Sequence, residues 1–404
     1  MEGSPLIQSL HLTGLLSYGP NSEPVELGPL NVLIGPNASG KSNLIQGLSL
    51  LRGAAGDLAG TVRQGGGIPE WLWKGPNSQG TGQIEARVSF PEGPGPLRYR
   101  LRLATAAQRL EVVAEAVENA DALPGDDFPV SFFQVEEGKV VSERARPEAP
   151  VPPTGGVTVR GRGIVMKPGQ SILSLLAPVP SWYPEVSFLG GSFREIRTFS
   201  NWDLGPNSPL HAPQKVDLPS DFLLEDASNL GLVLNDLEHG QEGLQAVMGR
   251  LQSLYEPVER ITMKVQGGTA QVYVHERGLA QPIPTSRMSD GMLRYLCLLA
   301  ILCHPSPPPL ICIEEPELGL HPDVLGTVAE LLVEASRRTQ LIVTTHSDIL
   351  VSALNDVPEA ILVCERDEDG THLRRLEKDK LEEWLEDYTL GDLWLRGKLG
   401  GTTT

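Results

Sequence analysis

The stretch GPNASGKS, from Gly35 to Ser42, fits the spacing G-x-x-x-x-G-K-[ST] without a mismatch. An apolar run, LNVLI at 30–34, precedes it, and a helical pattern follows it from about Lys41 to Arg52. In such a loop the backbone N–H groups form a nest for anions, and the following helix points its positive end at the phosphates. Lys41 would reach the β- and γ-phosphate oxygens, and Ser42 would ligate Mg²⁺. A purely structural Gly-rich turn would not need the strand before it and the helix after it.

The stretch therefore predicts a nucleotide site at the end of a strand. The expected nucleotide-binding residues are Gly35, Pro36, Asn37, Ala38, Ser39, Gly40, Lys41, Ser42 and Asn43.

A second stretch, LICIEEPELGLHP at 310–322, places two carboxylates directly after four apolar residues. This pattern predicts a buried strand that delivers acids to the carboxyl end of a parallel sheet, where ligands bind in open α/β folds. Glu314 would hold the Mg²⁺ or its water shell, and Glu315 would orient and polarise the attacking water. The alternative, two solvated acids at a strand end, is weaker in a chain that also carries the 35–42 loop.

A third stretch, LIVTTHSDIL at 341–350, is another apolar run that ends in Thr345 and His346. A histidine at the same sheet edge can donate a hydrogen bond to a γ-phosphate oxygen and so sense its presence. A lone histidine is more often only a satisfied polar residue, but its position after the strand that follows the acidic one favours the sensing role.

A fourth stretch, SRMSDGMLRYLCLLAIL at 286–302, opens with the polar triplet Ser289-Asp290-Gly291 and continues as a helix that is apolar nearly all round. A helix apolar on every face is usually buried. Its N-terminus is nevertheless the kind of helix end that binds anions, with no charged partner nearby in the sequence.

The order of these stretches along the chain resembles the head of ATP-binding-cassette (ABC) ATPases. The motifs SDGMLRYLCLLAIL, EEPELGLHP and TTHSDIL resemble, more narrowly, the predicted stand-alone AAA/ABC-type ATPases related to RecF and to SMC heads. Softer matches, LLEDASNLGLVLNDL at 223–237 and LGDLWLRGKLGG at 390–401, extend the resemblance over nearly the whole chain.

The resemblance implies ATP and Mg²⁺ as ligands and a homodimer closed by ATP. In the family the signature loop caps the γ-phosphate of ATP held by the opposite subunit, so Ser289, Asp290 and Gly291 would act in trans. PELGLHP, at 316–322, would be the loop that communicates between the two sites. The implied catalytic residues are Glu315, His346 and Lys41.

The chain also departs from the ABC pattern. Glu314 stands where most ABC heads have Asp, and its side chain is one methylene longer. Only Ser289 and Gly291 match the usual signature motif. Gln170 and Gln214 lie in the region expected for a Q-loop glutamine, without a supporting context. Tyr18 could stack on adenine, although a core tyrosine is the better interpretation.

The composition is that of a globular protein, with 40% hydrophobic and 21% charged residues. The net charge of −18 argues against a general DNA-coating protein, although the Arg-rich stretches at 98–102 and 159–163 could form a local patch. Solvated strand faces are the simpler interpretation of both.

The longest apolar run, 296–303, is too short to span a membrane, and no signal peptide is expected, so the chain is predicted to be cytoplasmic. The four cysteines are expected to be buried and reduced.

The periodicity predicts an α/β fold with a mixed or parallel core sheet, an antiparallel β subdomain and a helical insertion. The resemblance implies a P-loop NTPase of the ABC-ATPase-head type. The stretch 146–156 is expected to be a flexible loop. The whole chain, 1–404, is predicted to be one head. Its expected parts are 1–55, the P-loop half of the core; 56–169, the antiparallel β subdomain; 170–285, a mainly helical insertion; 286–359, the half with the signature, the acidic strand and His346; and 360–404, a C-terminal hairpin and tail.

Several function classes compete. SMC and double-strand-break-repair ATPases need long coiled-coil arms, but the insertion is rich in strands and proline and lacks heptads. A transporter ATPase and a nuclease with a Toprim domain are also weaker interpretations. Toprim chemistry needs acids on two separate strands, whereas Glu365, Asp367 and Asp369 lie within one predicted hairpin turn. The favoured prediction is an ATP-hydrolysing switch that works with DNA or with a separate nuclease or other effector in repair or phage defence. An ATP-gated binding module with negligible turnover stays open.

Overall fold

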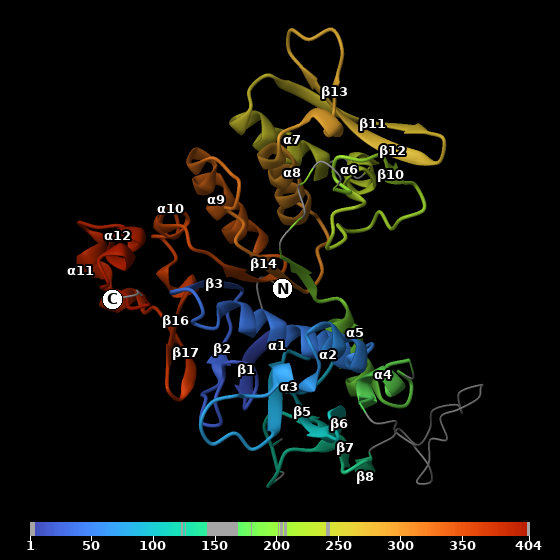
Figure 1. The fold of residues 1–404 in the computed structure, drawn as a ribbon, viewed down its shortest axis with the longest axis vertical. Coiled ribbons are helices and arrows are strands. Elements are labelled where there is room, and N and C mark those ends of the chain that lie inside the picture. Colours follow the sequence, from blue (N-terminus) through green and yellow to red (C-terminus); the bar gives the residue numbers. More distant parts are fainter. Residues whose placement is uncertain are drawn as a thin grey trace.

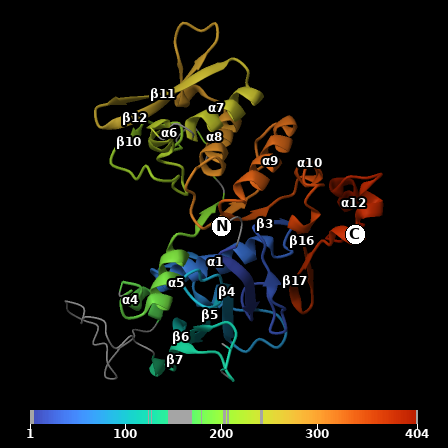
Figure 2. The same ribbon diagram turned by 180° about the vertical axis from the view of Figure 1, so that it is seen from behind.

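The structure is a computed structural model, which describes residues 5–122, 124–125, 127–143, 169–178, 180–200, 202, 205, 208–239 and 243–401. Figure 1 shows three layers along its long axis: a core sheet in the middle, an antiparallel sheet below it, and a lobe of helices and a small sheet above it. The view from behind, in Figure 2, shows the same order of layers. The predicted stretches 146–156 and 159–163 lie outside the described residues.

The core sheet has six strands in the order β17-β16-β3-β15-β14-β9. All neighbouring pairs are parallel except β16 and β17, which form an antiparallel hairpin. The predicted core sheet is therefore confirmed. The strands are β3 (Leu30–Ile34), β9 (Arg197–Phe199), β14 (Leu310–Glu314), β15 (Gln340–Thr344), β16 (Ile361–Asp367) and β17 (Gly370–Arg375).

Both faces of the core sheet are covered, because successive residues of its strands enter two different hydrophobic clusters. Val32 and Ile34 of β3 belong to the cluster shared with the upper lobe, and Leu33 belongs to the cluster shared with the antiparallel sheet. Helices near the sheet are α1 (Lys41–Ala54), α8 (Asp290–Leu302), α9 (Leu325–Ala335), α10 (Asp348–Ser352), α11 (Glu382–Leu385) and α12 (Leu390–Leu395). In α8 every residue from 293 to 302 is buried, as its all-round apolar pattern predicted.

The lower sheet is antiparallel and has seven strands in the order β2-β1-β4-β5-β6-β7-β8. Its strands from β4 to β8, at 81–143, lie within the part expected to be an antiparallel β subdomain, 56–169. In β5 the leucines and Tyr99 are buried, while Arg98 and Arg100 lie on the other face and pair with Glu118. The interpretation of 98–102 as a solvated strand face is therefore correct. The strands are β1 (Ile7–Thr13), β2 (Val25–Glu26), β4 (Thr81–Val88), β5 (Leu97–Ala106), β6 (Arg109–Asn119), β7 (Ser131–Glu136) and β8 (Lys139–Glu143).

The segment 170–285, predicted as mainly helical, holds both helices and strands. It contains α4 (Ile172–Leu176), α5 (Pro184–Arg194), α6 (Leu230–His239) and α7 (Gly243–Leu254), but its last part forms strands. Buried and partly buried residues alternate along β12, which is the period of a strand and not of a helix. The small sheet consists of β10 (Gln214–Lys215), β11 (Val258–Gln266), β12 (Thr269–Glu276) and β13 (Ile283–Pro284).

The short elements complete the fold. They are α2 (Leu58–Gln64), α3 (Ile68–Trp71) and single 3₁₀ turns at Thr285–Arg287, Pro322–Val324, Pro358–Ala360 and Lys378–Lys380. Among the helices of the described residues, none has the length and apolar character that crossing a membrane requires.

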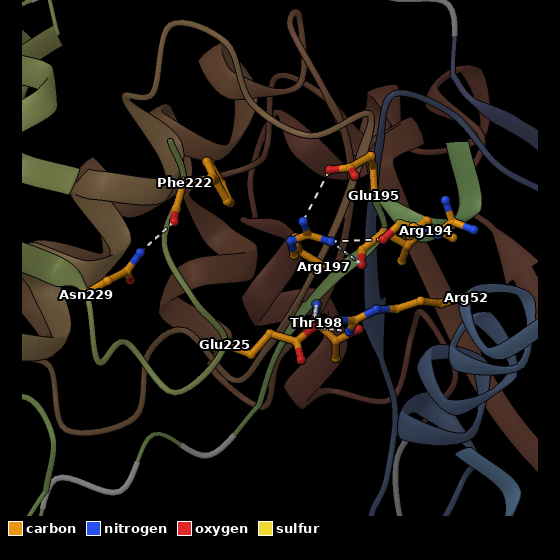
Figure 3. Close-up of polar contacts among 9 residues, drawn as sticks. Arg52, Arg194, Glu195, Arg197, Thr198, Phe222, Glu225 and Asn229 are labelled. Atoms are coloured by element: carbon orange, nitrogen blue, oxygen red, sulfur yellow. Dashed lines mark hydrogen bonds and ion pairs between the residues drawn. The ribbon is translucent and has the colours of Figure 1, made fainter. Parts of the chain in front are cut away.

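A polar joint connects the P-loop helix to the segment that leads into the upper lobe (Figure 3). The Glu225 carboxylate accepts a hydrogen bond from the backbone N–H of Thr198 in β9 at 2.9 Å and pairs with Arg52 near the end of α1. Arg194 donates to the carbonyl of Ala55, at 2.7 Å. The edge strand β9 and residues 222–229 are thereby tied to the end of α1.

Candidate nucleotide site

The Gly35–Ser42 loop runs from the end of β3 into α1, as predicted, and two of its glycines are required by close packing. At Gly35, φ is +146°, and an added Cβ would lie 2.2 Å from the carbonyl oxygen of Cys364. At Gly40, φ is +107°, and a Cβ would lie 2.2 Å from Thr371 Oγ1. The β16–β17 hairpin therefore supports the loop from behind, and only glycine fits at these two positions.

A cavity of about 340 Å³ opens in front of this loop. It brings Lys41 and Ser42 together with Glu315 and His346, which come from the ends of two other strands. Its lining residues are Asn37, Ala38, Gly40, Lys41, Ser42, Asn43, Glu315, Thr344, His346 and Arg366. Gly35, Pro36, Ser39 and Glu314 are not part of this lining but adjoin it. The residues that follow β3, β14 and β15 come together because these strands are parallel and their carboxyl ends share one edge of the sheet.

Lys41 and Ser42 make the contacts that define the floor of the cavity. The Lys41 ammonium donates to the carbonyls of Gly35 at 2.8 Å and Pro36 at 2.9 Å, and burial lowers its pKa. Ser42 Oγ donates to Glu314 Oε2 at 2.7 Å. Burial raises the pKa of Glu314, and the bond from Ser42 opposes that shift.

The Ser42 and Glu314 pair fits a magnesium ion. Hydroxyl and carboxylate oxygens are ligands that Mg²⁺ accepts, and it usually takes one or two protein carboxylates and completes its shell with water and phosphate oxygens. Within the described ranges no cluster of three or more His, Cys, Asp or Glu side chains could form an all-protein metal site. The residues present therefore suit an ion held jointly with a nucleotide.

Glu315 and His346 face each other across the cavity. Their closest side-chain atoms, Glu315 Oε1 and His346 Nε2, are 3.9 Å apart, and each side chain is 37% exposed. The peptide that carries His346 is fixed by Glu317, whose Oε1 accepts from the His346 N–H and from Thr345 Oγ1, both at 2.7 Å. Burial, with help from Lys41, lowers the pKa of His346 and so favours the neutral imidazole, which can donate from one ring nitrogen.

The predicted signature residues lie at the N-terminus of α8 and do not line the P-loop cavity. Ser289 caps the helix by accepting from the Met292 N–H at 3.3 Å, and Asp290 contacts His211 Nε2 at 3.2 Å. At Gly291 an added Cβ would lie 2.7 Å from the carbonyl of Gly319, in the 316–322 loop. Within one chain, then, this end of α8 contacts that loop and not the nucleotide cavity.

Sequence reasoning missed two residues of the cavity lining, Thr344 in β15 and the cation Arg366. Arg366 lies at the end of β16, and its Nη1 donates to the carbonyl of Ala38 at 3.4 Å. The pattern of ERDEDG predicted only a hairpin turn, and that part is confirmed: Asp367 Oδ1 accepts from the N–H groups of Asp369 and Gly370 across the turn. No local signal indicated that this turn would lie beside the P-loop.

The other open candidates lie elsewhere. Tyr18 is 2% exposed, so its ring belongs to the core, and burial raises the pKa of its hydroxyl. Gln214 accepts a hydrogen bond from the Gly231 N–H at 2.7 Å in the upper lobe. Neither it nor Gln170 lines the cavity.

The fold and this site define a P-loop protein of the ABC-ATPase-head class. The chain belongs to the family described as "AAA domain, putative AbiEii toxin, Type IV TA system", which matches residues 30–146 and 168–352. It also has the fold of solved SMC heads. One, bound to the C-winged helix domain of ScpA, gives a TM-score of 0.58 at 13% identity, over 93% of this chain and 99% of the other. A head from Pyrococcus furiosus, bound to the C-terminal domain of ScpA, gives 0.57 at 13% identity, over 95% and 99%.

A curated relative matches over a shorter stretch. The Old nuclease of Escherichia phage P2 is 44% identical to the chain over 75 residues, which are 18% of this chain and 12% of that protein. The chain thus spans a small part of that relative's length.

Proposed function

We propose that the protein is an ATP-hydrolysing switch, which closes as a homodimer around two nucleotides. The observation that carries the proposal is the cavity in which Lys41 and Ser42 of the P-loop face Glu315 and His346. Anion binding, magnesium ligation and water activation each have a residue of suitable chemistry there. We further propose that the chain works as a single head over 1–404.

In this proposal the loop N–H groups and Lys41 bind the β- and γ-phosphates of ATP. Lys41 would exchange its bonds to the carbonyls of Gly35 and Pro36 for phosphate oxygens. Ser42 and Glu314 would hold Mg²⁺, which, when bound, neutralises charge on the β- and γ-phosphate oxygens. Arg366 would add a second cation from the rim of the cavity.

Hydrolysis would proceed by attack of water on the γ-phosphorus. Glu315 orients the water and takes one of its protons, the new bond forms from the water oxygen to phosphorus, and the bond from phosphorus to the bridging oxygen of ADP breaks. His346, whose neutral form is favoured by burial, donates a hydrogen bond to a γ-phosphate oxygen. Glu317 holds the backbone of His346 in place for this contact.

A second copy of the chain would complete the site. Ser289, Asp290 and Gly291 do not line the cavity of their own chain, and they form the N-terminal end of a helix, where backbone N–H groups attract anions. In the closed dimer these residues would cap the γ-phosphate held by the partner.

The test is the mass of the Glu315→Gln variant by light scattering, with and without ATP and Mg²⁺. Loss of the water-activating carboxylate should leave binding intact and prevent reopening, so the mass should double with ATP. Adding Ser289→Arg should abolish the doubling. If the Glu315→Gln variant binds ATP but its mass does not change, the trans arrangement is contradicted, and Ser289 is only a helix cap.

We also infer a nucleic-acid-related partner, such as DNA or a separate nuclease or other effector. The support is the matched segment of the Old nuclease and the size of the antiparallel sheet and upper lobe, which contribute no residue to the cavity lining. Such a partner should stimulate turnover. ATPase rates unchanged by double-stranded DNA, single-stranded DNA, RNA and co-purifying proteins would count against it.

A further inference from the structure

Arg294 is the one charged residue in a run of ten buried residues, 293–302, of the signature helix α8. It is 6% exposed. Burying a guanidinium costs free energy unless its donors are used, so an arginine in this apolar helix needs a specific partner.

The partner of Arg294 is the backbone of Glu315, the residue proposed to activate water. Arg294 Nη1 donates to the carbonyl oxygen of Glu315 at 3.3 Å, and the guanidinium lies 5.5 Å from the centre of the Trp202 ring. Burial lowers the pKa of Arg294, and the nearby Cys297, Glu317 and Glu315 oppose the shift. The group is therefore held by one carbonyl, one ring face and the negative field of the 315–317 loop.

Glu315 has a backbone conformation that must be held in place. Its φ is +48°, in the left-handed region that residues with a Cβ rarely adopt. Three contacts fix the two flanking peptides. The Glu315 N–H donates to Thr344 O at 2.9 Å, the Leu318 N–H donates to Glu315 O at 3.1 Å, and Arg294 donates to the same carbonyl. The first two are local to the sheet edge and the turn, while only the third comes from α8.

We propose that Arg294 is a positioning residue for the reaction: it holds the Glu315 peptide in its left-handed conformation and so aims the carboxylate into the nucleotide cavity. The orientation of the Glu315 carboxylate then depends on the position of α8 relative to the 315–317 loop. The same helix begins at Ser289, the residue proposed to contact the partner's nucleotide. A movement of the N-terminal end of α8 would thus be transmitted by the Arg294 side chain to the Glu315 peptide of the same chain.

This inference rests on the proposed ATPase function, and it also makes a structural prediction that does not need turnover. In Arg294→Met, which keeps length and removes the donors, the amides of Glu315 and Leu318 should exchange hydrogen at least about tenfold faster than in the wild type, because their turn loses a restraint. The turnover number for ATP should fall on the order of 10- to 100-fold, with little change in nucleotide affinity, because only the aim of Glu315 changes. Arg294→Lys should recover part of both effects.

The matched control is Arg338→Met. Arg338 also donates from its guanidinium to a backbone carbonyl of α8, Leu302 O at 2.7 Å, but at the opposite end of the helix. This variant should leave exchange at Glu315 and Leu318 unchanged. In the double variant Arg294→Met with Glu315→Gln, turnover should equal that of Glu315→Gln alone, because both changes act through one carboxylate.

Two results would overturn the inference: equal exchange at the two amides in Arg294→Met and Arg338→Met, or losses of turnover that multiply in the double variant. Thermal melting of Arg294→Lys identifies any loss caused by unfolding. If the wild-type protein neither binds nor hydrolyses ATP, the proposed function fails by itself, and the exchange measurement still decides whether Arg294 holds the turn.

Discussion

Two buried regions of the molecule hold ionisable side chains, and they use them differently. At the carboxyl edge of the core sheet, Lys41, Glu314 and His346 have pKa values shifted by burial, and they surround or adjoin an open cavity. In the antiparallel sheet, Glu115 is 1% exposed, and burial raises its pKa to about 7. Its oxygens accept from Tyr99 Oη at 2.7 Å, Ser171 Oγ at 2.5 Å and the Ile172 N–H at 2.8 Å.

The difference shows that a perturbed pKa does not by itself mark a functional site. These three bonds run to the core and to the start of α4, where Ser171 is the cap residue, so Glu115 joins α4 to the sheet. At the core edge, in contrast, Lys41 and His346 line an open cavity. The comparison predicts that changes in one region alter turnover and changes in the other alter stability.

The largest effect is expected from Glu315→Gln. Removing the proton acceptor should lower the ATP turnover number by roughly 10²- to 10⁴-fold, the range for general bases. The melting temperature should stay close to that of the wild type, since the side chain is partly exposed. Steady-state phosphate release and calorimetry measure the two quantities.

The control for this variant is Glu330→Gln, which removes a surface carboxylate that pairs with Arg250. It should leave turnover intact. Near-normal turnover in Glu315→Gln would contradict the catalytic role assigned to the edge of the core sheet, and with it the contrast between the two regions.

The second effect concerns Glu115 and depends on pH. Because its pKa rises from 4.5 to about 7 on folding, the folded state binds the proton more tightly. Its contribution to the free energy of unfolding is full below pH 4.5 and is lost as pH rises to about 7. At roughly 1.4 kcal/mol per pKa unit, the loss is about 3 kcal/mol.

Glu115→Gln should therefore lose stability relative to the wild type mainly at low pH, with the difference shrinking as pH rises from 4.5 to 8. Urea unfolding at several pH values measures it, and ATP turnover should be unchanged at a temperature where both proteins are folded. A difference in stability that is the same at every pH would contradict the assignment of a buried, proton-binding carboxyl.

The smallest effect is expected from Arg366→Met. Loss of an exposed cation at the cavity rim should weaken ATP binding by about fivefold, or about 1 kcal/mol, because solvent screens the charge. Binding of a fluorescent ATP analogue measures the change. Arg374→Met is the control, because Arg374 lies on the same hairpin but donates to Leu399 O. Equal affinities for ATP in Arg366→Met and Arg374→Met would show that Arg366 does not contribute to the site, which would then consist of the residues predicted from the sequence.

Much of the candidate site could be predicted because it is encoded locally. The residues from Gly35 to Ser42, the acids after β14 and the histidine after β15 each follow a short apolar strand. Parallel strands bring their carboxyl ends to one edge whatever the length of chain between them. The antiparallel β subdomain expected at 56–169 contains the strands from β4 to β8, and the all-round apolar pattern of 293–302 predicted a buried helix.

What the sequence alone determined, then, is the type of the elements that carry the candidate site and the chemistry at their ends, because these follow from spacing within about ten residues. Only the tertiary structure decided which distant segments meet. It placed the β16–β17 hairpin behind the P-loop with Arg366 on the cavity rim, added β9 as the edge of the core sheet, and set Arg294 on the backbone of Glu315. Such contacts depend on how whole faces pack, and no local period carries that information.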